Sequence, residues 1–178
     1  MAQEIERKCH CKDQAFIDSI QAQEEYTYIE QRYFHEPNHD NSVARVRIYY
    51  VEGISNNPAS DDNYKHSEIT VKTGRGIVRS EVNVPIDYYV ASDLMYPHPD
   101  VSIISKKRYT FPYGNEVIDF DIYQGENAGL VHIEIEFETE EEALAFVPPA
   151  FFGDEVTDDM RHTNSSLQDN PYTYWEYQ

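Results

Sequence analysis

Eight short segments of this chain have the composition or the alternating pattern of β-strands. Successive side chains of a strand point to opposite faces, so a period of two gives a strand one apolar face and one polar face. In seven of the segments the polar face carries formal charge. The predicted strands are residues 4–11, 25–34, 43–51, 68–72, 77–84, 102–111, 116–123 and 130–138.

Three other segments have the apolar spacing of helices. Residues 12–22 place apolar side chains on one side, and Asp13 suits the start of that helix. A second helix is expected over 85–95, and the prolines that follow end it because proline cannot continue a helix interior. Residues 139–142 form a capping-box pattern, which predicts a short helix over 143–147.

The connections between these elements are polar and rich in turn-forming residues. The turn at 35–41 carries His35 and His39, but histidines on a polar loop are more often solvated than bound to metal. Residues 53–65 are expected to form a polar insertion. The glycine-rich segment 73–76 lacks both the lysine–serine/threonine ending and the following helix of a phosphate-binding loop, so it predicts a hairpin turn.

The charged faces of the strands distinguish two architectures. In an open sheet packed on helices these faces would meet water, whereas in a closed antiparallel barrel they would line an interior large enough for a ligand. The predicted inner cations are half of the chain's 14 Lys and Arg: Lys8, Arg45, Arg47, Lys72, Arg79, Lys106 and Arg108. The predicted inner acids are Glu4, Glu6, Glu81, Asp119, Asp121, Glu134 and Glu136. Solubility does not explain why scarce cations gather on strands. We therefore expect a mainly β (α+β) barrel, with flanking helices over its apolar exterior, that binds a polyanion and a divalent metal.

Length and charge limit the domain count and the partners. The 178 residues suit one domain, which we place at 1–168, followed by a polar and aromatic tail at 169–178 that either docks on the barrel or is disordered. The seven inner cations and seven inner acids cancel, which assigns the formal net charge of -19 to the exterior. Such a surface repels nucleic acid and anionic membranes but does not exclude a small anionic substrate. The chain is expected to be a monomer or a homodimer.

Two features predict a cytoplasmic location. The charged residues 4–8 stand where a secretion signal would have its apolar region, and no apolar run is long enough to span a bilayer. Cys9 and Cys11 are too close in sequence for a good disulfide and too few for a structural zinc site, so free thiols are expected.

The opening segment Glu4-Ile5-Glu6-Arg7-Lys8 resembles the ExExK signature of the triphosphate tunnel metalloenzymes, the CYTH superfamily. An ordered set of further segments, within residues 2–167, resembles the short bacterial tripolyphosphatase-type members. They are Arg45-Val46-Arg47, Ile69-Thr70-Val71-Lys72 with Gly76 and Arg79-Ser80-Glu81, Lys106-Lys107-Arg108-Tyr109, Gly125 with Ala128-Gly129-Leu130, Glu134-Ile135-Glu136, and Phe151 to Thr157 with Arg161 and Asn164.

The resemblance implies an eight-stranded antiparallel tunnel that binds a triphosphate between a basic and an acidic patch. The implied ligands of Mg²⁺ or Mn²⁺ are Glu4, Glu6, Glu134 and Glu136, together with Asp119 and Asp121. The implied phosphate-binding residues are Lys8, Arg45, Arg47, Lys72, Arg79, Lys106 and Arg108. Glu81 would orient Arg79 or Arg45. Carboxylate oxygens suit hard cations, and arginine suits phosphate oxygens.

The resemblance leaves two candidates for the base that activates the attacking water. By resemblance it is Lys72 paired with Tyr33, or else Lys106, since a lysine amid cations has a lowered pKa. The chain departs from the short members after Gly53, at Asp119 where a glutamate is expected, and at His162 where a tyrosine is usual.

Three functions compete at this stage. The first is a metal-dependent hydrolase of inorganic tripolyphosphate or a related triphosphate. The second is a CYTH-type adenylate cyclase that makes cyclic AMP and pyrophosphate from ATP. The third is a non-catalytic triphosphate-binding protein. The sequence favours the hydrolase because no residue is identified that would read a nucleobase, and because a pure binder would not need both acids and bases.

Overall fold

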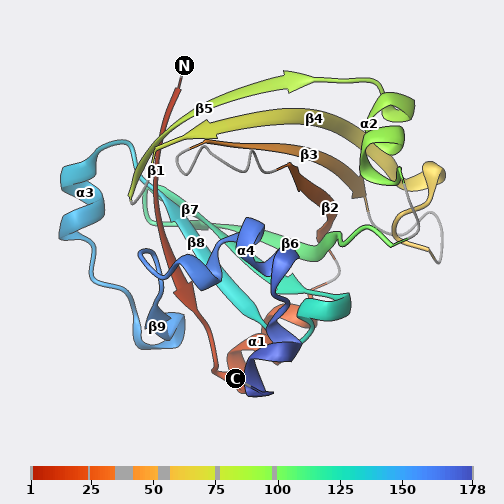
Figure 1. Ribbon diagram of the computed structural model, residues 1–178. Helices are drawn as coiled ribbons and strands as arrows, with labels where there is room; N and C mark the ends of the chain where they lie inside the picture. Colours follow the sequence, from red (N-terminus) through yellow and green to blue (C-terminus); the bar gives the residue numbers. More distant parts are fainter. Residues whose placement is uncertain are drawn as a thin grey trace.

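The computed structural model describes residues 2–23, 25–34, 42–51, 57–74, 77–97 and 100–177, without the side chains of residues 2–3 and 176–177. Eight strands form a closed antiparallel barrel in the order β1-β5-β4-β3-β2-β6-β7-β8, and β8 pairs with β1 to complete it (Figure 1). The strands are β1 (Ala2–His10), β2 (Thr27–Phe34), β3 (Ser42–Val51), β4 (Tyr64–Thr73), β5 (Val78–Pro85), β6 (Ile104–Tyr113), β7 (Glu116–Tyr123) and β8 (Val131–Glu136). The predicted barrel is confirmed.

Strand β1 closes the barrel by pairing with different neighbours along its length. Residues 2–5 pair with β5, and residues 6–10 pair with β8. Beyond the end of β5, the two-residue strand β9 (Asp154–Glu155) pairs with the last part of β1. Gly153 makes this approach possible: its φ is +80°, and a Cβ there would lie 2.2 Å from the carbonyl oxygen of His10.

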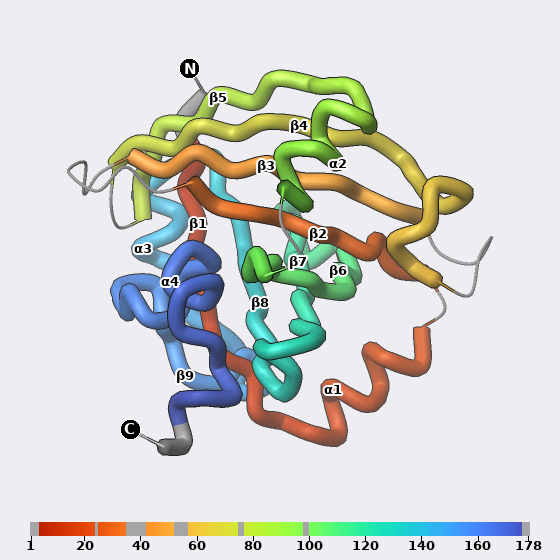
Figure 2. The backbone as a smooth tube through the Cα atoms, turned by 45° about the vertical axis from the view of Figure 1, so that its right-hand side comes forward, coloured from red at the N-terminus to blue at the C-terminus, as the bar shows by residue number. Residues whose placement is uncertain are grey.

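Within the described residues, four short α-helices and five 3₁₀ turns lie around the barrel (Figure 2). The α-helices are α1 (Gln14–Gln21), α2 (Tyr88–Met95), α3 (Glu140–Ala145) and α4 (Asn164–Asp169). The 3₁₀ turns are η1 (Asp61–Asn63), η2 (Gly125–Asn127), η3 (Ala150–Phe152), η4 (Met160–His162) and η5 (Tyr172–Tyr177). The predicted capping box of α3 is present, because Thr139 and Glu142 bond reciprocally.

The apolar faces of the strands point outward and form the core together with the covering segments. One buried cluster lies beneath α1, α3 and η3 and includes Phe120, Ile133 and Phe152. A second cluster joins Ile48 of β3 to Met95 of α2. Burying these side chains outside the barrel stabilises the fold and leaves the polar faces for the interior.

Some predicted boundaries were displaced. Strand β4 begins at Tyr64 rather than at residue 68, because Tyr64 pairs with Tyr50 of β3 and extends the hairpin past the expected loop. Helix α2 begins at Tyr88 rather than at residue 85, because Pro85 still belongs to β5 and the side chain of Asp87 caps the helix. Strand β6 continues to Tyr113, and the turn is made by Gly114 with a φ of +66°.

The C-terminal tail lies on the barrel. Tyr172 and Trp175 of η5 pack against a cluster that contains Ile104, Leu130 and Leu167. The proposed boundary at residue 168 falls inside α4. The turn at 35–41, residues 52–56 and residues 75–76 lie outside the described residues, so the predictions for His35, His39 and the centre of the glycine-rich turn stay predictions.

Candidate active site

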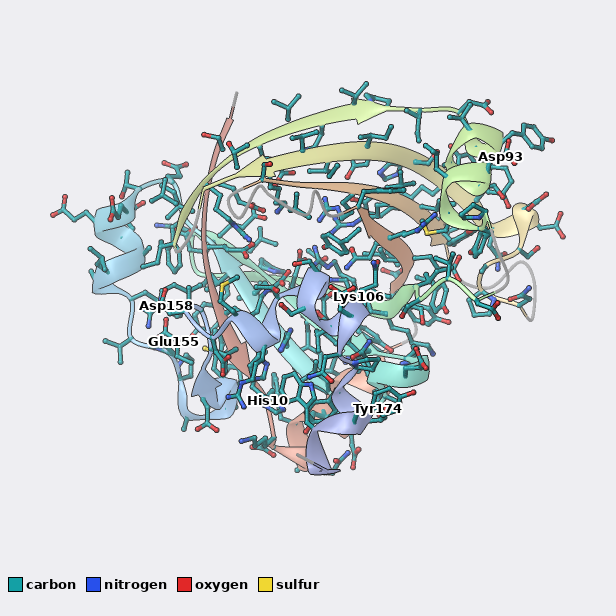
Figure 3. All side chains as sticks on the ribbon, viewed as in Figure 1. His10, Asp93, Lys106, Glu155, Asp158 and Tyr174 are labelled. Carbon is teal, nitrogen blue, oxygen red and sulfur yellow. The ribbon has the colours of Figure 1, made fainter. Side chains whose placement is uncertain are left out.

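The barrel encloses a cavity of about 700 Å³ that is lined by polar side chains. Twelve of the fifteen predicted site residues lie on its wall: Glu4, Glu6, Lys8, Tyr33, Arg45, Arg47, Lys72, Arg79, Glu81, Arg108, Glu134 and Glu136. The other three, Lys106, Asp119 and Asp121, are not part of the lining. In Figure 3 Lys106 lies within the barrel, whereas Asp93 lies at the periphery on α2. The alternation of each strand therefore positions most of the predicted site.

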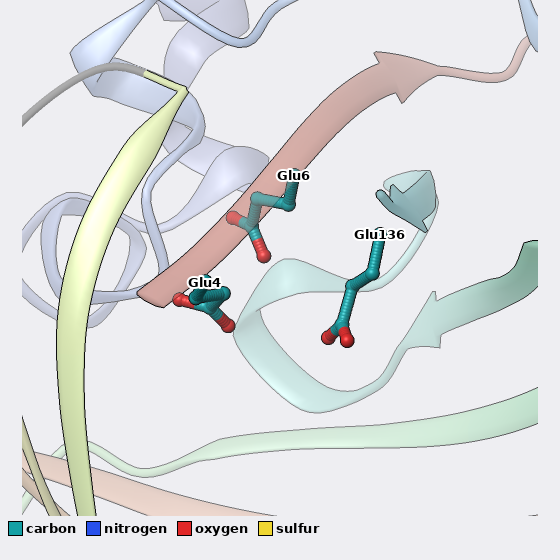
Figure 4. A group of neighbouring side chains, drawn as sticks. All are labelled: Glu4, Glu6 and Glu136. Carbon is teal, nitrogen blue, oxygen red and sulfur yellow. The ribbon is translucent and has the colours of Figure 1, made fainter. Parts of the chain in front are cut away.

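Three carboxylates converge at one side of the cavity (Figure 4). Glu4 and Glu6 on β1 and Glu136 on β8 each offer an oxygen, and these oxygens lie within 4.8 Å of one another. Residues 6 and 136 are paired across the two strands, which brings the carboxylates together. This trio is the group of potential metal ligands found among the described residues.

The electrostatics of this acidic trio fit a divalent cation. Burial, followed by repulsion from Glu6, raises the pKa of Glu4. Burial and the charges of Glu4 and Glu6 likewise raise the pKa of Glu136. Converging carboxylates of this kind cost free energy unless a cation neutralises them, and oxygen ligands suit hard divalent ions.

Cations of the neighbouring strands already share these carboxylates. Lys72 of β4 contacts Glu4 at 2.6 Å and Glu81 at 2.8 Å. Arg79 of β5 pairs with Glu6 and lies 3.2 Å from Glu4. Burial alone would raise the pKa of Glu6, but Lys8 and Arg79 lower it. The acidic trio and the basic wall are therefore in direct contact.

A second acidic group is neutralised by arginine. Arg108 lies 2.5 Å from Asp119 and 2.6 Å from both Asp121 and Glu134. Glu134 also pairs with Lys8 at 3.0 Å. These contacts neutralise Asp119, Asp121 and Glu134, which are not members of the acidic trio.

Lys106 is fully buried beneath the cavity wall. Its ammonium pairs with Asp121, which is also fully buried. Burial, followed by the nearby charge of Arg108, lowers the pKa of Lys106 to about 8. The predicted lowering of its pKa is present, but burial is the main cause rather than the surrounding cations.

Tyr33 contributes a phenol to the same cavity. Its residue is 7% exposed. Burial alone would raise the pKa of Tyr33, but the positive charges of Arg45 and Arg47, with two lysines, lower it. A more acidic phenol at the cavity wall is suited to proton transfer.

The basic wall presents more hydrogen-bond donors than the described residues can accept. Arg47 donates to Gln31 at 3.0 Å and to the hydroxyl of Tyr49 at 2.8 Å, and Arg45 donates to Thr70 at 2.8 Å. Nε of Arg45 and Nε2 of Gln31 are buried without a hydrogen-bond partner among the described residues. Of the two residues Arg45 lines the cavity, so a phosphoryl oxygen bound there would supply the acceptor that its Nε lacks.

Several lining residues were missed by the sequence reasoning. Tyr49 and Glu68 belong to strands that were predicted, but the sequence reasoning assigned no role to either of them. A hydroxyl-rich wall from the C-terminal region also lines the cavity, with Thr157, Asp159, Thr163, Asn164, Ser165 and Ser166. Only the family resemblance pointed to Thr157 and Asn164, because nothing in the strand pattern places this segment.

Proteins of known activity resemble this chain in sequence and fold. An inorganic triphosphatase of Nitrosomonas europaea is 34% identical over 101 residues, which are 56% of this chain and 66% of the relative. An inorganic triphosphatase of Acetivibrio thermocellus is 35% identical over 134 residues, which are 75% of each chain. The crystal structure of the inorganic triphosphatase NE1496 superposes with a TM-score of 0.58 at 25% identity, covering 94% of this chain and 95% of that chain. No family model matches the chain.

The closed antiparallel barrel, with acidic and basic walls facing one cavity, has the tunnel fold of the neighbouring triphosphatase structure. With the identity to the Acetivibrio relative, this shows that the chain belongs to the family of the inorganic triphosphatases, the triphosphate tunnel metalloenzymes of the CYTH superfamily. No helix in the described ranges combines the length and apolarity needed to cross a membrane.

Proposed function

We propose that this protein is a divalent-metal-dependent hydrolase of a triphosphate, inorganic tripolyphosphate or a related compound, which it binds inside the barrel. The observation that carries the proposal is the contact between an acidic wall and a basic wall in one cavity. The acidic trio of Glu4, Glu6 and Glu136 lies directly beside Lys72 and Arg79. The two related inorganic triphosphatases support the same reaction class.

The basic wall would hold the substrate. Arg45 and Arg47 stand on the inner face of β3, and the unpartnered Nε of Arg45 would bind a phosphoryl oxygen. In the reaction a water oxygen bonds to a terminal phosphorus while the P–O anhydride bond breaks. The leaving pyrophosphate takes the electron pair, and the arginines stabilise the charge that develops.

Glu4, Glu6 and Glu136 would hold Mg²⁺ or Mn²⁺. When bound, the ion would offset the negative charge of the phosphates. The ion would compete with Lys72 and Arg79 for the carboxylate oxygens, which would leave these cations to pair with the substrate. Glu134, Asp119 and Asp121 we assign instead to holding Lys8, Lys106 and Arg108 in place.

For proton transfer from water we favour Tyr33 with Lys72 over Lys106. Tyr33 and Lys72 both line the cavity, and the surrounding cations lower the pKa of Tyr33. Lys106 is buried and pairs with Asp121 away from the lining. The cytoplasmic location and the oligomeric state, monomer or homodimer, stay predictions.

The test is a product analysis of purified protein by anion-exchange chromatography. Tripolyphosphate and ATP are incubated separately, each with Mg²⁺, with Mn²⁺ and with a chelator. We expect orthophosphate and pyrophosphate from tripolyphosphate in the presence of metal, with no cyclic AMP from ATP. Cyclic AMP with pyrophosphate would replace the proposal with the cyclase. Binding of tripolyphosphate without any product would leave the non-catalytic binder.

A further inference from the structure

A chain of hydrogen bonds runs through the barrel wall beneath the hydroxyl-rich wall of the cavity. Nδ1 of His162 lies 2.9 Å from Nε2 of His132, and Nδ1 of His132 lies 3.2 Å from the hydroxyl of Tyr123. The hydroxyl of Tyr123 donates to Oδ1 of Asn164. His132 is fully buried, while His162 and Asn164 line the cavity. The chain thus begins and ends at the cavity wall.

The direction of each hydrogen bond follows from the one before it. Because the Tyr123 hydroxyl gives its only proton to Asn164, it must accept from Nδ1–H of His132. A neutral His132 then accepts at Nε2, so His162 donates from its Nδ1–H. With Oδ1 of Asn164 facing Tyr123, every hydrogen bond of the chain is satisfied while both imidazoles stay neutral.

The surroundings keep both imidazoles neutral. Burial, followed by the charge of Lys8, lowers the pKa of His132 well below its usual range. Burial and the neighbouring ring of His10 lower the pKa of His162 to about 4. Lys106 and Glu134 also face His132, and Asp159 and Arg161 face His162. Both rings are therefore neutral at neutral pH, and neither can donate from both of its nitrogens.

The orientation of its amide determines what Asn164 presents to the cavity. With Oδ1 occupied by Tyr123, the free part of the amide is its NH₂ group. The described residues supply no hydrogen-bond acceptor for this Nδ2, and the residue lies on the cavity wall. An amide NH₂ suits an anionic oxygen, whereas a reversed amide would point its oxygen at the substrate and repel it.

We propose that Asn164 binds a phosphoryl oxygen of the substrate through Nδ2, and that Tyr123, His132 and His162 are positioning residues that hold its amide in that orientation. This inference rests on the proposed function, because it names a further binding residue of the same cavity. It adds a neutral donor to the cations of the basic wall.

Two variants of Asn164 distinguish the loss of its NH₂ donor from a loss of folding. Asn164→Asp keeps an oxygen for Tyr123 and replaces the NH₂ donor with a negatively charged oxygen. It should fold normally because a carboxylate in the first turn of α4 is favourable. Asn164→Ala removes the donor without adding charge. Both should bind tripolyphosphate at least about tenfold more weakly, since a hydrogen bond to a charged group is lost.

Tyr123→Phe tests the positioning role, with Tyr50→Phe as its matched control. The hydroxyl of Tyr50 also bonds to a side chain, Glu30, but that pair is not part of the cavity lining. Tyr123→Phe frees the amide of Asn164 to rotate, so it should raise Kd and KM for tripolyphosphate several-fold with a smaller change in kcat. Tyr50→Phe should leave all three unchanged. Melting temperatures for every variant identify any loss of folding.

The binding measurement is a titration of tripolyphosphate, without metal, followed by calorimetry and by the fluorescence of Trp175. This residue is the chain's single tryptophan, and its ring centroid lies 5.0 Å from that of His162. Wild-type Kd for both Asn164 variants would overturn the binding role of Asn164. Equal Kd for Tyr123→Phe and wild type would overturn the positioning role. If the wild type bound tripolyphosphate but did not hydrolyse it, the proposed hydrolase function would be wrong. The Kd values of the Asn164 variants would still test the binding role of Asn164. If the wild type did not bind tripolyphosphate, both the proposed function and the binding role of Asn164 would be wrong.

Discussion

Gln168 of α4 binds the backbone of Tyr33 at both of its polar groups. Its Oε1 accepts from the Tyr33 N–H at 2.7 Å, and its Nε2 donates to the Tyr33 carbonyl at 3.0 Å. The pairing of β2 with β6 ends at Gln31, so this edge of Tyr33 has no partner strand. A side chain from the C-terminal region therefore completes the strand that carries the cavity's phenol.

Gln168→Ala should affect catalysis more than substrate binding. Loss of both hydrogen bonds would loosen Tyr33, at a cost of about 1 kcal/mol for each bond. We expect kcat to fall about tenfold while KM changes much less, as for a misplaced proton acceptor. Steady-state kinetics on tripolyphosphate measure this. Gln14→Ala, at an exposed position of α1, is the control. A raised KM with unchanged kcat would contradict the account.

Glu136→Gln should weaken metal binding at the acidic trio. One of three converging carboxylates would lose its charge, so we expect the dissociation constant for Mn²⁺ to rise at least about tenfold. Titration of Mn²⁺ followed by electron paramagnetic resonance measures this without turnover. Glu138→Gln, two residues further and exposed, is the matched control. Equal affinity in the two variants would remove Glu136 from the metal site.

Lys106→Met should destabilise the fold but leave most of the kcat of the folded protein. The change breaks a fully buried pair and leaves Asp121 with Arg108 alone, which should lower the free energy of unfolding by about 3 kcal/mol. The folded fraction should keep most of its kcat, whereas Lys72→Met should lose it. Lys107→Met, on the outer face, is the control for stability. Loss of kcat in a fully folded Lys106→Met protein would restore Lys106 as the base.

Acid should destabilise the fold through the buried histidines. Burial lowers the folded-state pKa of His162 to about 4, from the ordinary value of 6.5. Between these pH values the unfolded chain binds more protons than the folded protein, so the free energy of unfolding falls as the pH falls through this window. Urea unfolding at pH 7 and at pH 5 should show a smaller difference for His162→Gln than for the wild type. An identical difference would show that His162 is not responsible.

The strand pattern predicted the fold well because the alternation of polar and apolar residues within each strand shows which face is polar. Arg45 and Arg47, or Glu4 and Glu6, share a face by local geometry, and closing the barrel then turns those faces inward. The grouping of the acids could not be predicted in this way. Whether Glu134 joins Glu136 or pairs with Lys8 depends on cross-strand register and on neighbouring cations.

The hydroxyl-rich wall of the cavity could not be predicted from the alternation of the strands, for a different reason. Residues 157–166 are mostly turns and short helices without a period, and Thr163 to Ser166 reach the cavity only because α4 packs on β2. His132 of β8 and His162 of η4 are 30 residues apart and meet through a second long-range contact. Long-range contacts of this kind leave no local signal in the sequence.

A time course of tripolyphosphate followed by ³¹P nuclear magnetic resonance tests the central claim most directly. The wild type, Arg47→Ala inside the barrel and Arg32→Ala outside it would be compared with and without Mg²⁺. We predict metal-dependent conversion to equal amounts of orthophosphate and pyrophosphate by the wild type and Arg32→Ala, and strongly reduced conversion by Arg47→Ala. Conversion by Arg47→Ala at the wild-type rate, or none by the folded wild type, would contradict a triphosphatase site inside the barrel.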